Sequence, residues 1–250
     1  IIKRMKILFS NIVSIFIYIK DNIEEVYFVY LKGLSVVHCI GDSHILVFKH
    51  RFLFQDLQHK YFKLTMVHGA TVSGLDNPNS KTNAGNIFNK RIKSLKENDT
   101  VVFLLGEVDL GFVIWWRQQK YNIPLEDMYC LAVENYKKLL LSVEKCKTVI
   151  VISVPLPTIS DDTTTGEVAN LRKEVKATQY ERTQLTIKFN ENIAEFCLVR
   201  GFKFVALDSL TLDQETGVIS PYFLNNDKMD HHYDLVKYAN IIQLKIKDFL

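Results

Sequence analysis

The sequence lacks the features that mark several classes of protein. Its four cysteines form no Cys-x-x-Cys pair, and 31 basic and 28 acidic side chains leave a formal net charge of only +3. Widely separated cysteines indicate free thiols rather than a disulfide framework or a zinc ribbon, which favours a reducing compartment such as the cytoplasm. Charges of both signs are interleaved along the chain, so there is no basis for a nucleic-acid-binding patch. The cysteines are Cys39, Cys130, Cys146 and Cys197.

The N-terminal apolar run is too short to span a membrane. It extends over twelve residues, from Ile7 to Tyr18, whereas a transmembrane helix needs about 20. Basic residues precede it, as in a signal peptide or anchor, but no small-residue cleavage site follows. We interpret the run as a helix packed on the domain, with a membrane-associated segment as the alternative. Because the sequence begins with Ile rather than Met, its interpretation as a fragment of a longer protein also stays open.

Length and composition predict one globular domain preceded by a short extension. The 250 residues suffice for one well-filled core, whereas two domains would each have a small one. Apolar residues make up 48% and charged residues 24% of the chain, as in ordinary globular proteins. We therefore assign residues 1–33 to an N-terminal helical extension and residues 34–250 to a single domain.

Short apolar runs alternate with longer segments of helical periodicity. The apolar runs predict strands at 34–40, 61–67, 100–105, 148–154 and 202–206. Apolar spacings of three and four predict helices at about 44–59, 86–97, 125–145, 176–200 and 233–249. This alternation predicts a mostly parallel central sheet with helices on both faces, which is a three-layer α/β/α sandwich.

Glycine and polar residues follow each of the first three predicted strands. The sequence reads GDSH at 41–44, HG at 68–69 with SG at 73–74, and GEVD at 106–109. In open α/β sheets the ligand site lies beyond the carboxyl ends of the strands. We therefore expect these segments to meet at one edge of the sheet and to form the functional site there.

Ser43 is the first candidate for chemistry. It follows a buried strand and begins a predicted helix, whose first N–H groups lack partners within the helix and favour negative charge. Such a position can hold a nucleophile next to part of an oxyanion hole. The competing interpretation is that Asp42 or Ser43 merely caps the helix, which both residue types do well.

The Gly-Asp-Ser context of Ser43 resembles the first sequence block of the SGNH or GDSL-like hydrolases. The resemblance rests on short motifs spread from Val36 to Tyr238. It implies a flavodoxin-like α/β/α fold and ester hydrolysis or acyl transfer through an acyl-enzyme, without a metal or an organic cofactor. A histidine near the C-terminus would be the base, since family members carry an Asp-x-x-His block there.

The second and third blocks of the family supply the oxyanion hole. The resemblance assigns the backbone N–H groups of Ser43, Gly69 and Gly106 to it, with Gly74 as the alternative to Gly69. Val108 stands where most members have an asparagine that donates to the oxyanion. The loss of one such donor typically lowers the rate by about 10²–10³. The GEVD form resembles a subgroup with Gly-Glu-Ile-Asp, found in proteins linked to polysaccharide modification.

The last block supplies the base and its acid. Members commonly have an aromatic residue six positions after the catalytic histidine, and Tyr238 stands in that relation to His232, which favours His232 over His231. The family places the acid three residues before the histidine, where this chain has Met229. Asp227 and Asp230 flank that position, and either is a candidate to orient the imidazole.

The resulting hypothesis is a serine esterase or O-acyltransferase acting on an O-acylated carbohydrate. The polar segments beside the site are expected to bind the substrate through Asp42, His44, Gly74, Asn77, Glu107, Asp109 and His231. No metal site is expected, because only His231 and His232 have ligand-like spacing. A carbohydrate-binding or polysaccharide-assembly protein with a decayed site is the rival hypothesis, and Val108 and the displaced aspartate are its sequence evidence.

Overall fold

The structure, a computed structural model, is described here for residues 23–162, 175–227 and 230–250. Five parallel strands form one sheet in the order β2-β1-β3-β4-β5. The strands are β1 (Ser35–Gly41), β2 (Lys60–Met66), β3 (Thr100–Leu104), β4 (Thr148–Ile152) and β5 (Lys203–Val205). Each lies within two residues of its predicted position. For the central strands β1, β3 and β4 the reason is that a strand buried on both faces is a continuous apolar run. The prediction of a parallel-sheet α/β sandwich is confirmed.

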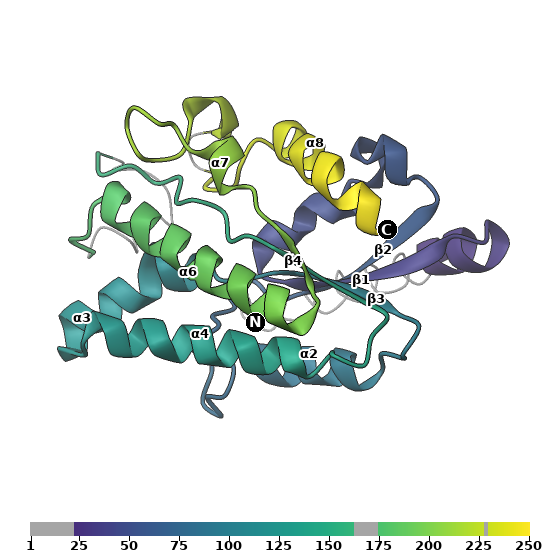
Figure 1. The fold of residues 1–250 in the computed structure, drawn as a ribbon, viewed down its shortest axis with the longest axis horizontal. Helices are drawn as coiled ribbons and strands as arrows, with labels where there is room; N and C mark the ends of the chain where they lie inside the picture. The colour runs from purple at the N-terminus through teal and green to yellow at the C-terminus, as the bar shows by residue number, and fades with distance from the viewer. Residues whose placement is uncertain (1–22, 163–174, 228–229) are drawn as a thin grey trace, which may run out of the picture.

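Helices cover both faces of the sheet and complete the three layers (Figure 1). One face carries α2 (Ala84–Lys93), α3 (Ile114–Tyr121), α4 (Leu125–Leu141) and α6 (Gln179–Arg200). The other face carries α8 (Leu235–Ile246) and a series of 3₁₀ turns after β1. Along β3 the side chains alternate between two cores: Val101 and Phe103 belong to the first, and Val102 and Leu104 to the second.

Local capping sets the ends of the longer helices. Thr178 and Glu181 form a reciprocal capping box at the start of α6, and Gly201 ends that helix with φ of 72°. The Asp234 side chain accepts a hydrogen bond from the Lys237 N–H at the start of α8. The closing helix therefore begins three residues after His232, the predicted base.

The prediction of an α-helix over 44–59 is wrong. The segment consists of three 3₁₀ helices: η2 (Ser43–Lys49), η3 (Arg51–Leu53) and η4 (Gln55–Leu57). On a regular α-helix Phe48 and Phe54 would lie about 120° apart, but the bend between η2 and η3 lets both rings stack at 5.1 Å in the core. Core packing of these side chains thus replaces the regular helix that the apolar spacing suggested.

Several short elements had no counterpart in the sequence prediction. They are the π-helical segment η5 (Asp109–Val113) with the helix α3 that follows it directly, the helix α7 (Asp208–Thr211), and the 3₁₀ turn η6 (Pro221–Phe223). Each is four or five residues long at most, or is fused to a neighbouring helix, so none shows the repeated apolar spacing that identifies a helix from sequence.

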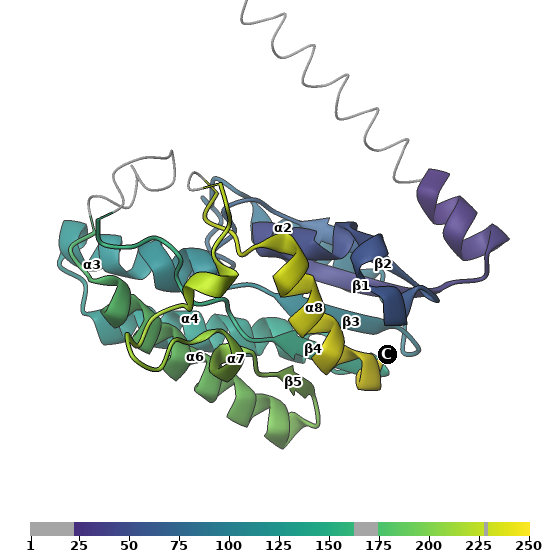
Figure 2. The same cartoon turned by 90° about the horizontal axis from the view of Figure 1, so that it is seen from above.

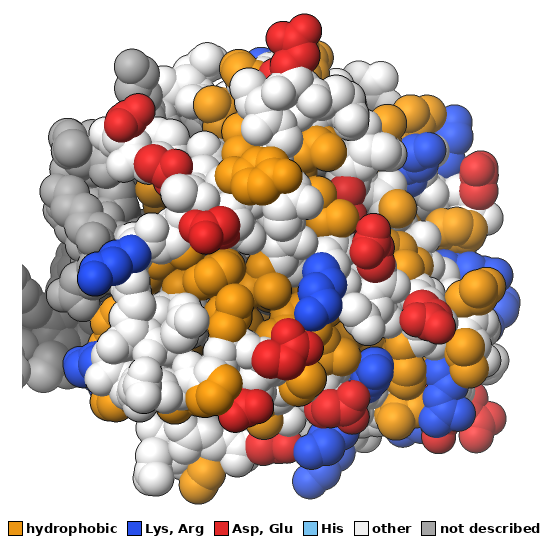
Figure 3. Space-filling view, turned by 60° about the vertical axis from the view of Figure 1, so that its left-hand side comes forward, with side chains coloured by type: hydrophobic (Ala, Val, Ile, Leu, Met, Phe, Trp, Pro, Cys, Tyr) orange, Lys and Arg blue, Asp and Glu red, His pale blue; other side chains and the backbone are white. Residues whose placement is uncertain are grey.

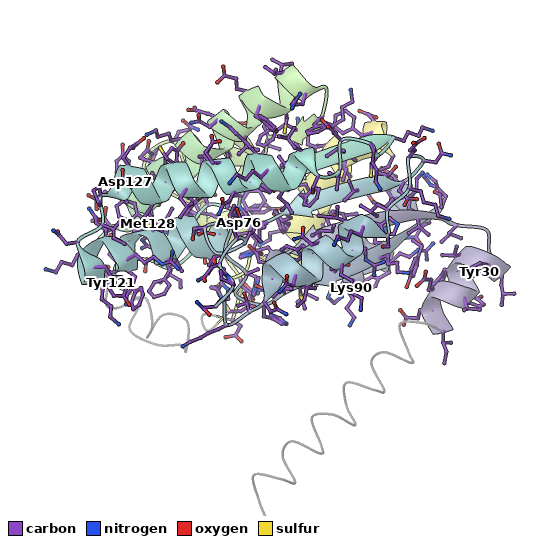
Figure 4. All side chains as sticks on the ribbon, turned by 90° about the horizontal axis from the view of Figure 1, so that it is seen from below. Tyr30, Asp76, Lys90, Tyr121, Asp127 and Met128 are labelled. Carbon is purple, nitrogen blue, oxygen red and sulfur yellow. The ribbon has the colours of Figure 1, made fainter. Side chains whose placement is uncertain are left out.

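The segment before β1 contains η1 (Val26–Leu31), which lies beyond the end of the sheet (Figure 2). Its contacts with the domain include the ring of Phe28, which stacks on Tyr61 at 6.1 Å, and an ion pair between Glu25 and Lys63. Tyr30 on the same element is 75% exposed and points away from the sheet (Figure 4). The expectation of a packed helix over Ile7–Tyr18 falls outside the described residues, and the boundary at residue 33 stays a prediction.

Two further observations concern membranes and thiols. Among the described residues, no helix combines the length and the hydrophobicity needed to cross a bilayer. All four cysteines are free, and only Cys130 is exposed. The compartment inferred from the cysteines stays a prediction.

Candidate active site

Ser43 lies at the first turn after β1, held there by a close approach between two strands. A Cβ atom at Gly41 would lie 2.0 Å from the carbonyl oxygen of Leu104 on β3, so only glycine fits this position. Asp42 then caps η2, because its carboxylate accepts the N–H of His44 at 2.9 Å. Ser43 is therefore the first residue of the helix, and its N–H is one of those without an intrahelical partner.

His232 lies within hydrogen-bond distance of Ser43. Its Nε2 is 2.8 Å from the Ser43 Oγ, and its Nδ1 is 2.6 Å from the Asp230 Oδ1. Asp230 also accepts the backbone N–H of His232 at 2.9 Å. Ser43, His232 and Asp230 thus form one hydrogen-bonded chain, with the geometry of a Ser-His-Asp triad.

The protonation state of His232 suits a general base. Burial lowers its pKa below the ordinary value of 6.5, and the neighbouring His44 lowers it further, against the opposing effect of Asp230. The pKa of Asp230 is also lowered, because hydrogen bonds from His232 outweigh the effect of burial. At neutral pH the imidazole is neutral and the carboxylate ionised, so Nε2 can accept a proton.

Asp230, and not Asp227, lies beside the imidazole. Asp227 is exposed, and its backbone carbonyl accepts the Asp230 N–H at 3.0 Å, closing a tight turn. Asn225, which the sequence analysis did not single out, donates its side-chain amide to the Asp230 Oδ2 at 3.0 Å. Asp230 lies two residues before His232, whereas the family spacing places the acid three residues before the histidine. Asp230 nevertheless takes the position of the acid beside the imidazole.

Two other residues missed in the sequence hold the histidine loop. The hydroxyl of Thr158 donates to the His231 carbonyl at 2.6 Å, and the Leu156 N–H donates to the Tyr233 hydroxyl at 2.7 Å. Both bonds join the loop after β4 to the segment before α8. No local pattern identifies Thr158, because its partner is 73 residues away.

Asp42 is a structural residue rather than the substrate contact that its motif suggested. It is 1% exposed, its Oδ1 accepts from the ring Nδ1 of His44 at 3.0 Å, and its Oδ2 accepts from the Gly106 N–H at 3.2 Å. The Gly106 N–H therefore points at Asp42 and is not available to an oxyanion. This geometry removes Gly106 from the predicted set of oxyanion donors.

Asp109 is also structural. It is 1% exposed, and its two carboxylate oxygens accept the N–H groups of Val72 at 2.5 Å and Ser73 at 3.1 Å. Burial raises its pKa to about 6. Asp109 thus fastens the loop after β2 to the loop after β3, and the expectation that it binds substrate is corrected.

The remaining predicted residues occupy different positions at the same edge of the sheet. Gly69 lies in an exposed turn with φ of 66°, whereas Gly74 is buried and donates its N–H to the Thr71 carbonyl at 3.3 Å. Glu107 is 3% exposed, and its charge acts on His232. Asn77 is exposed, and its side chain accepts the Asn79 N–H at 2.9 Å within a turn.

His44 and His231 both lie beside the base. The ring centroid of His44 is 4.6 Å from that of His232 and 5.8 Å from that of His231. One ring nitrogen from each of the three histidines lies within 4.8 Å of the other two, an arrangement that could hold a metal ion. The sequence analysis placed all three residues at the site, as the base and two substrate contacts, but gave no sign of a metal-binding arrangement, because His44 is far from the other two along the chain.

Neither a protein-family model nor a curated protein matches this chain. Its fold is similar to that of a GDSL-like lipase from Bacteroides thetaiotaomicron, with a TM-score of 0.55, 15% identity, and coverage of 87% of this chain and 88% of that one. A carbohydrate acetylesterase from Sinorhizobium meliloti has a TM-score of 0.54 at 12% identity, over 86% and 97% of the two chains. An acetyl xylan esterase has the same TM-score at 10% identity, over 86% and 99%. The chain therefore has the SGNH/GDSL-like hydrolase fold that its sequence motifs implied.

Proposed function

We propose that this protein is a serine-dependent ester hydrolase that works through an acyl-enzyme at Ser43. The observation that carries the proposal is the hydrogen-bonded chain from Ser43 through His232 to Asp230. In the first step His232 Nε2 takes the Ser43 proton as Oγ attacks the ester carbonyl carbon. The imidazolium, stabilised by Asp230, then gives that proton to the departing alcohol, and water releases the acyl group by the same steps.

Backbone N–H groups stabilise the negative charge that forms on the carbonyl oxygen. The N–H of Ser43 is one donor, since it lies at the unpaired start of η2. Gly69 is our second donor, because the N–H of Gly74, the alternative, already donates to the Thr71 carbonyl. Val108 replaces the side-chain donor of the family, so the site has fewer donors than most members and we expect a lower turnover.

We assign the substrate to the class of O-acylated carbohydrates. Two proteins with a similar fold are described as a carbohydrate acetylesterase and an acetyl xylan esterase. The polar turns around Asn77 can hydrogen-bond sugar hydroxyls. Figure 3 shows hydrophobic, acidic and basic side chains interspersed over the end of the molecule that it turns forward.

Hydrolysis and acyl transfer use the same residues. They differ in whether water or a sugar hydroxyl attacks the acyl-enzyme. We place the protein with the hydrolases, and O-acyl transfer is the finer alternative. Adding an acceptor sugar to the assay separates them: a transferase forms the acylated sugar, while a hydrolase releases only the free acid.

A fluorophosphonate probe tests whether Ser43 is a nucleophile. We expect the probe to label the wild-type protein and not Ser43→Ala, while Ser94→Ala is labelled like the wild type. Ser94 is a suitable control because it is exposed at the end of α2. The absence of labelling in the folded wild-type protein would reject the esterase and favour a binding protein with a decayed site.

A further inference from the structure

Three histidines from two distant segments meet at the candidate active site. The rings of His231 and His232 are 4.2 Å apart, and His44 lies 4.6 Å from His232. One nitrogen of each ring lies within 4.8 Å of the others. The acyl-enzyme mechanism uses only His232 as a base, so it gives no reason for a group of three imidazoles. Imidazole is a preferred ligand of zinc, copper and nickel.

Two of the rings are already oriented as metal ligands are. Asp42 Oδ1 lies 3.0 Å from the His44 Nδ1, and Asp230 Oδ1 lies 2.6 Å from the His232 Nδ1. A carboxylate that accepts an Nδ1–H fixes the tautomer and leaves the lone pair on Nε2. Histidine ligands of zinc almost always donate their other ring N–H in this way, to a carboxylate, a backbone carbonyl or water. The structure therefore has the supporting carboxylates as well as the ligands.

The spacing of the nitrogens is within reach of a tetrahedral zinc ion. Zinc–nitrogen bonds of about 2.0–2.1 Å require ligand nitrogens about 3.3 Å apart. The three ring nitrogens now lie within 4.8 Å of one another. The longest nitrogen–nitrogen distance would therefore have to shorten by about 1 Å or more for zinc to bind. His44 is held in the interior, but His231 and His232 are only half-buried, so their rings can turn toward it. Three protein ligands would leave the fourth position to water.

We propose that His44, His231 and His232 form a Zn²⁺ site, and that zinc binding there switches off the esterase. The new bonds are three zinc–nitrogen bonds, and the bond lost is the hydrogen bond between Ser43 and His232. With its Nε2 lone pair on zinc, His232 cannot accept the Ser43 proton. The metal site itself does not depend on the proposed function, whereas its inhibitory role does.

The binding test measures zinc directly and needs no activity. Chelator-treated full-length protein is titrated with Zn²⁺ by calorimetry, as wild type, Ser43→Ala, His231→Asn and the control His59→Asn. His59 is exposed on the segment before β2. We expect wild type, Ser43→Ala and His59→Asn to bind one equivalent. His231→Asn should bind zinc at least about 10-fold more weakly. Even the loss of a residue that only supports a metal ligand typically lowers the affinity by that factor. Equal binding by His231→Asn, or no binding by wild type, overturns the site.

The activity test addresses the inhibitory role. Each variant is compared with its own rate in chelator, so that a direct effect of His231→Asn on turnover cancels. We expect Zn²⁺ to abolish hydrolysis and probe labelling by the wild type at the concentrations at which it binds, and to inhibit His231→Asn only at concentrations at least about 10-fold higher. Stimulation by zinc, or unchanged activity in the zinc-loaded protein, overturns inhibition. Zinc binding without any hydrolysis or labelling leaves the metal site standing and rejects both inhibition and the proposed function.

Discussion

The Nε2 of His232 lies 2.8 Å from the Oγ of Ser43, although 189 positions separate the two residues. Ser43 follows the central strand β1, and His232 lies in the loop that leads into α8. Both elements pack into the same core, on the same face of the sheet. The packing of α8 against η2 therefore brings His232 to Ser43.

His232 and His231 should differ sharply when replaced. His232→Ala should lower kcat/KM by about 10⁴-fold or more, as much as Ser43→Ala, since residues that act as a unit are not additive. His231→Ala should cost far less, because the ring nitrogen that lies 2.8 Å from the Ser43 Oγ belongs to His232. Steady-state hydrolysis of an activated acetyl ester, measured with chelator present, compares the variants. An inactive His231→Ala beside an active His232→Ala would reverse the assignment.

The two aspartates of the same loop should also differ. Asp230→Asn removes the acceptor for the His232 Nδ1–H, and should lower kcat/KM by up to about 10⁴-fold. Asp227→Asn should stay close to wild type, because Asp227 contributes its backbone carbonyl to the turn. The same ester assay decides between them. Full activity in Asp230→Asn would show that the 2.6 Å contact does not serve catalysis.

The pH profile should report a base with a lowered pKa. Because burial and His44 lower the pKa of His232, the neutral, active form persists to a lower pH than an ordinary histidine would allow. The value of kcat/KM should fall only when the pH drops through that lowered pKa, which lies below 6.5. His44→Gln removes one of the two causes, so its midpoint should lie higher. A wild-type midpoint above 6.5, or a downward shift in His44→Gln, would contradict this.

Asp109 should make stability depend on pH in the direction opposite to that of an ordinary ion-paired carboxylate. Burial raises its pKa from 3.8 to about 6, so between these values the folded state holds a proton that the unfolded state has lost. The contribution of Asp109 to the free energy of unfolding is therefore largest at acidic pH, and it disappears as the pH rises through the pKa of Asp109 in the folded state. A shift of about two units corresponds to roughly 3 kcal/mol.

Urea denaturation of wild type and Asp109→Asn measures this effect. The difference in the free energy of unfolding, wild type minus variant, should decline by about 1–3 kcal/mol between pH 4 and pH 7. Asp208 also has a pKa raised to about 6 by burial, but it is present in both proteins and its contribution cancels. A difference that is constant or grows with pH would show that Asp109 titrates normally.

Restoring the missing oxyanion donor should speed the reaction. Val108 is half-buried at the position where the family has asparagine. Val108→Asn should raise kcat, by up to about 10²–10³ if the amide reaches the oxyanion, with little change in KM. Val108→Ala is the matched control, because it removes the valine side chain without adding a donor. Equal rates in the two variants would indicate that the position does not face the oxyanion.

The sequence by itself determined the sheet and the place of the serine. Buried parallel strands are continuous apolar runs, so β1, β3 and β4 could be located within two residues. The capping aspartate at 42 marks the start of a helix by local chemistry alone. These features depend on neighbours along the chain, which is why a single sequence was sufficient to find them.

Only the tertiary structure decided which polar groups meet. The sequence left Asp227 and Asp230 as alternatives, and the turn held by Asn225 selected Asp230. Gly106 was expected to serve an oxyanion, but its N–H donates to Asp42 across 64 residues. The three histidines were expected at the site as the base and two substrate contacts, but their arrangement as possible metal ligands was not foreseen. Each of these three outcomes depends on where a side chain or an N–H points relative to a partner that packing brings close. The spacing of residues along the chain does not determine that direction.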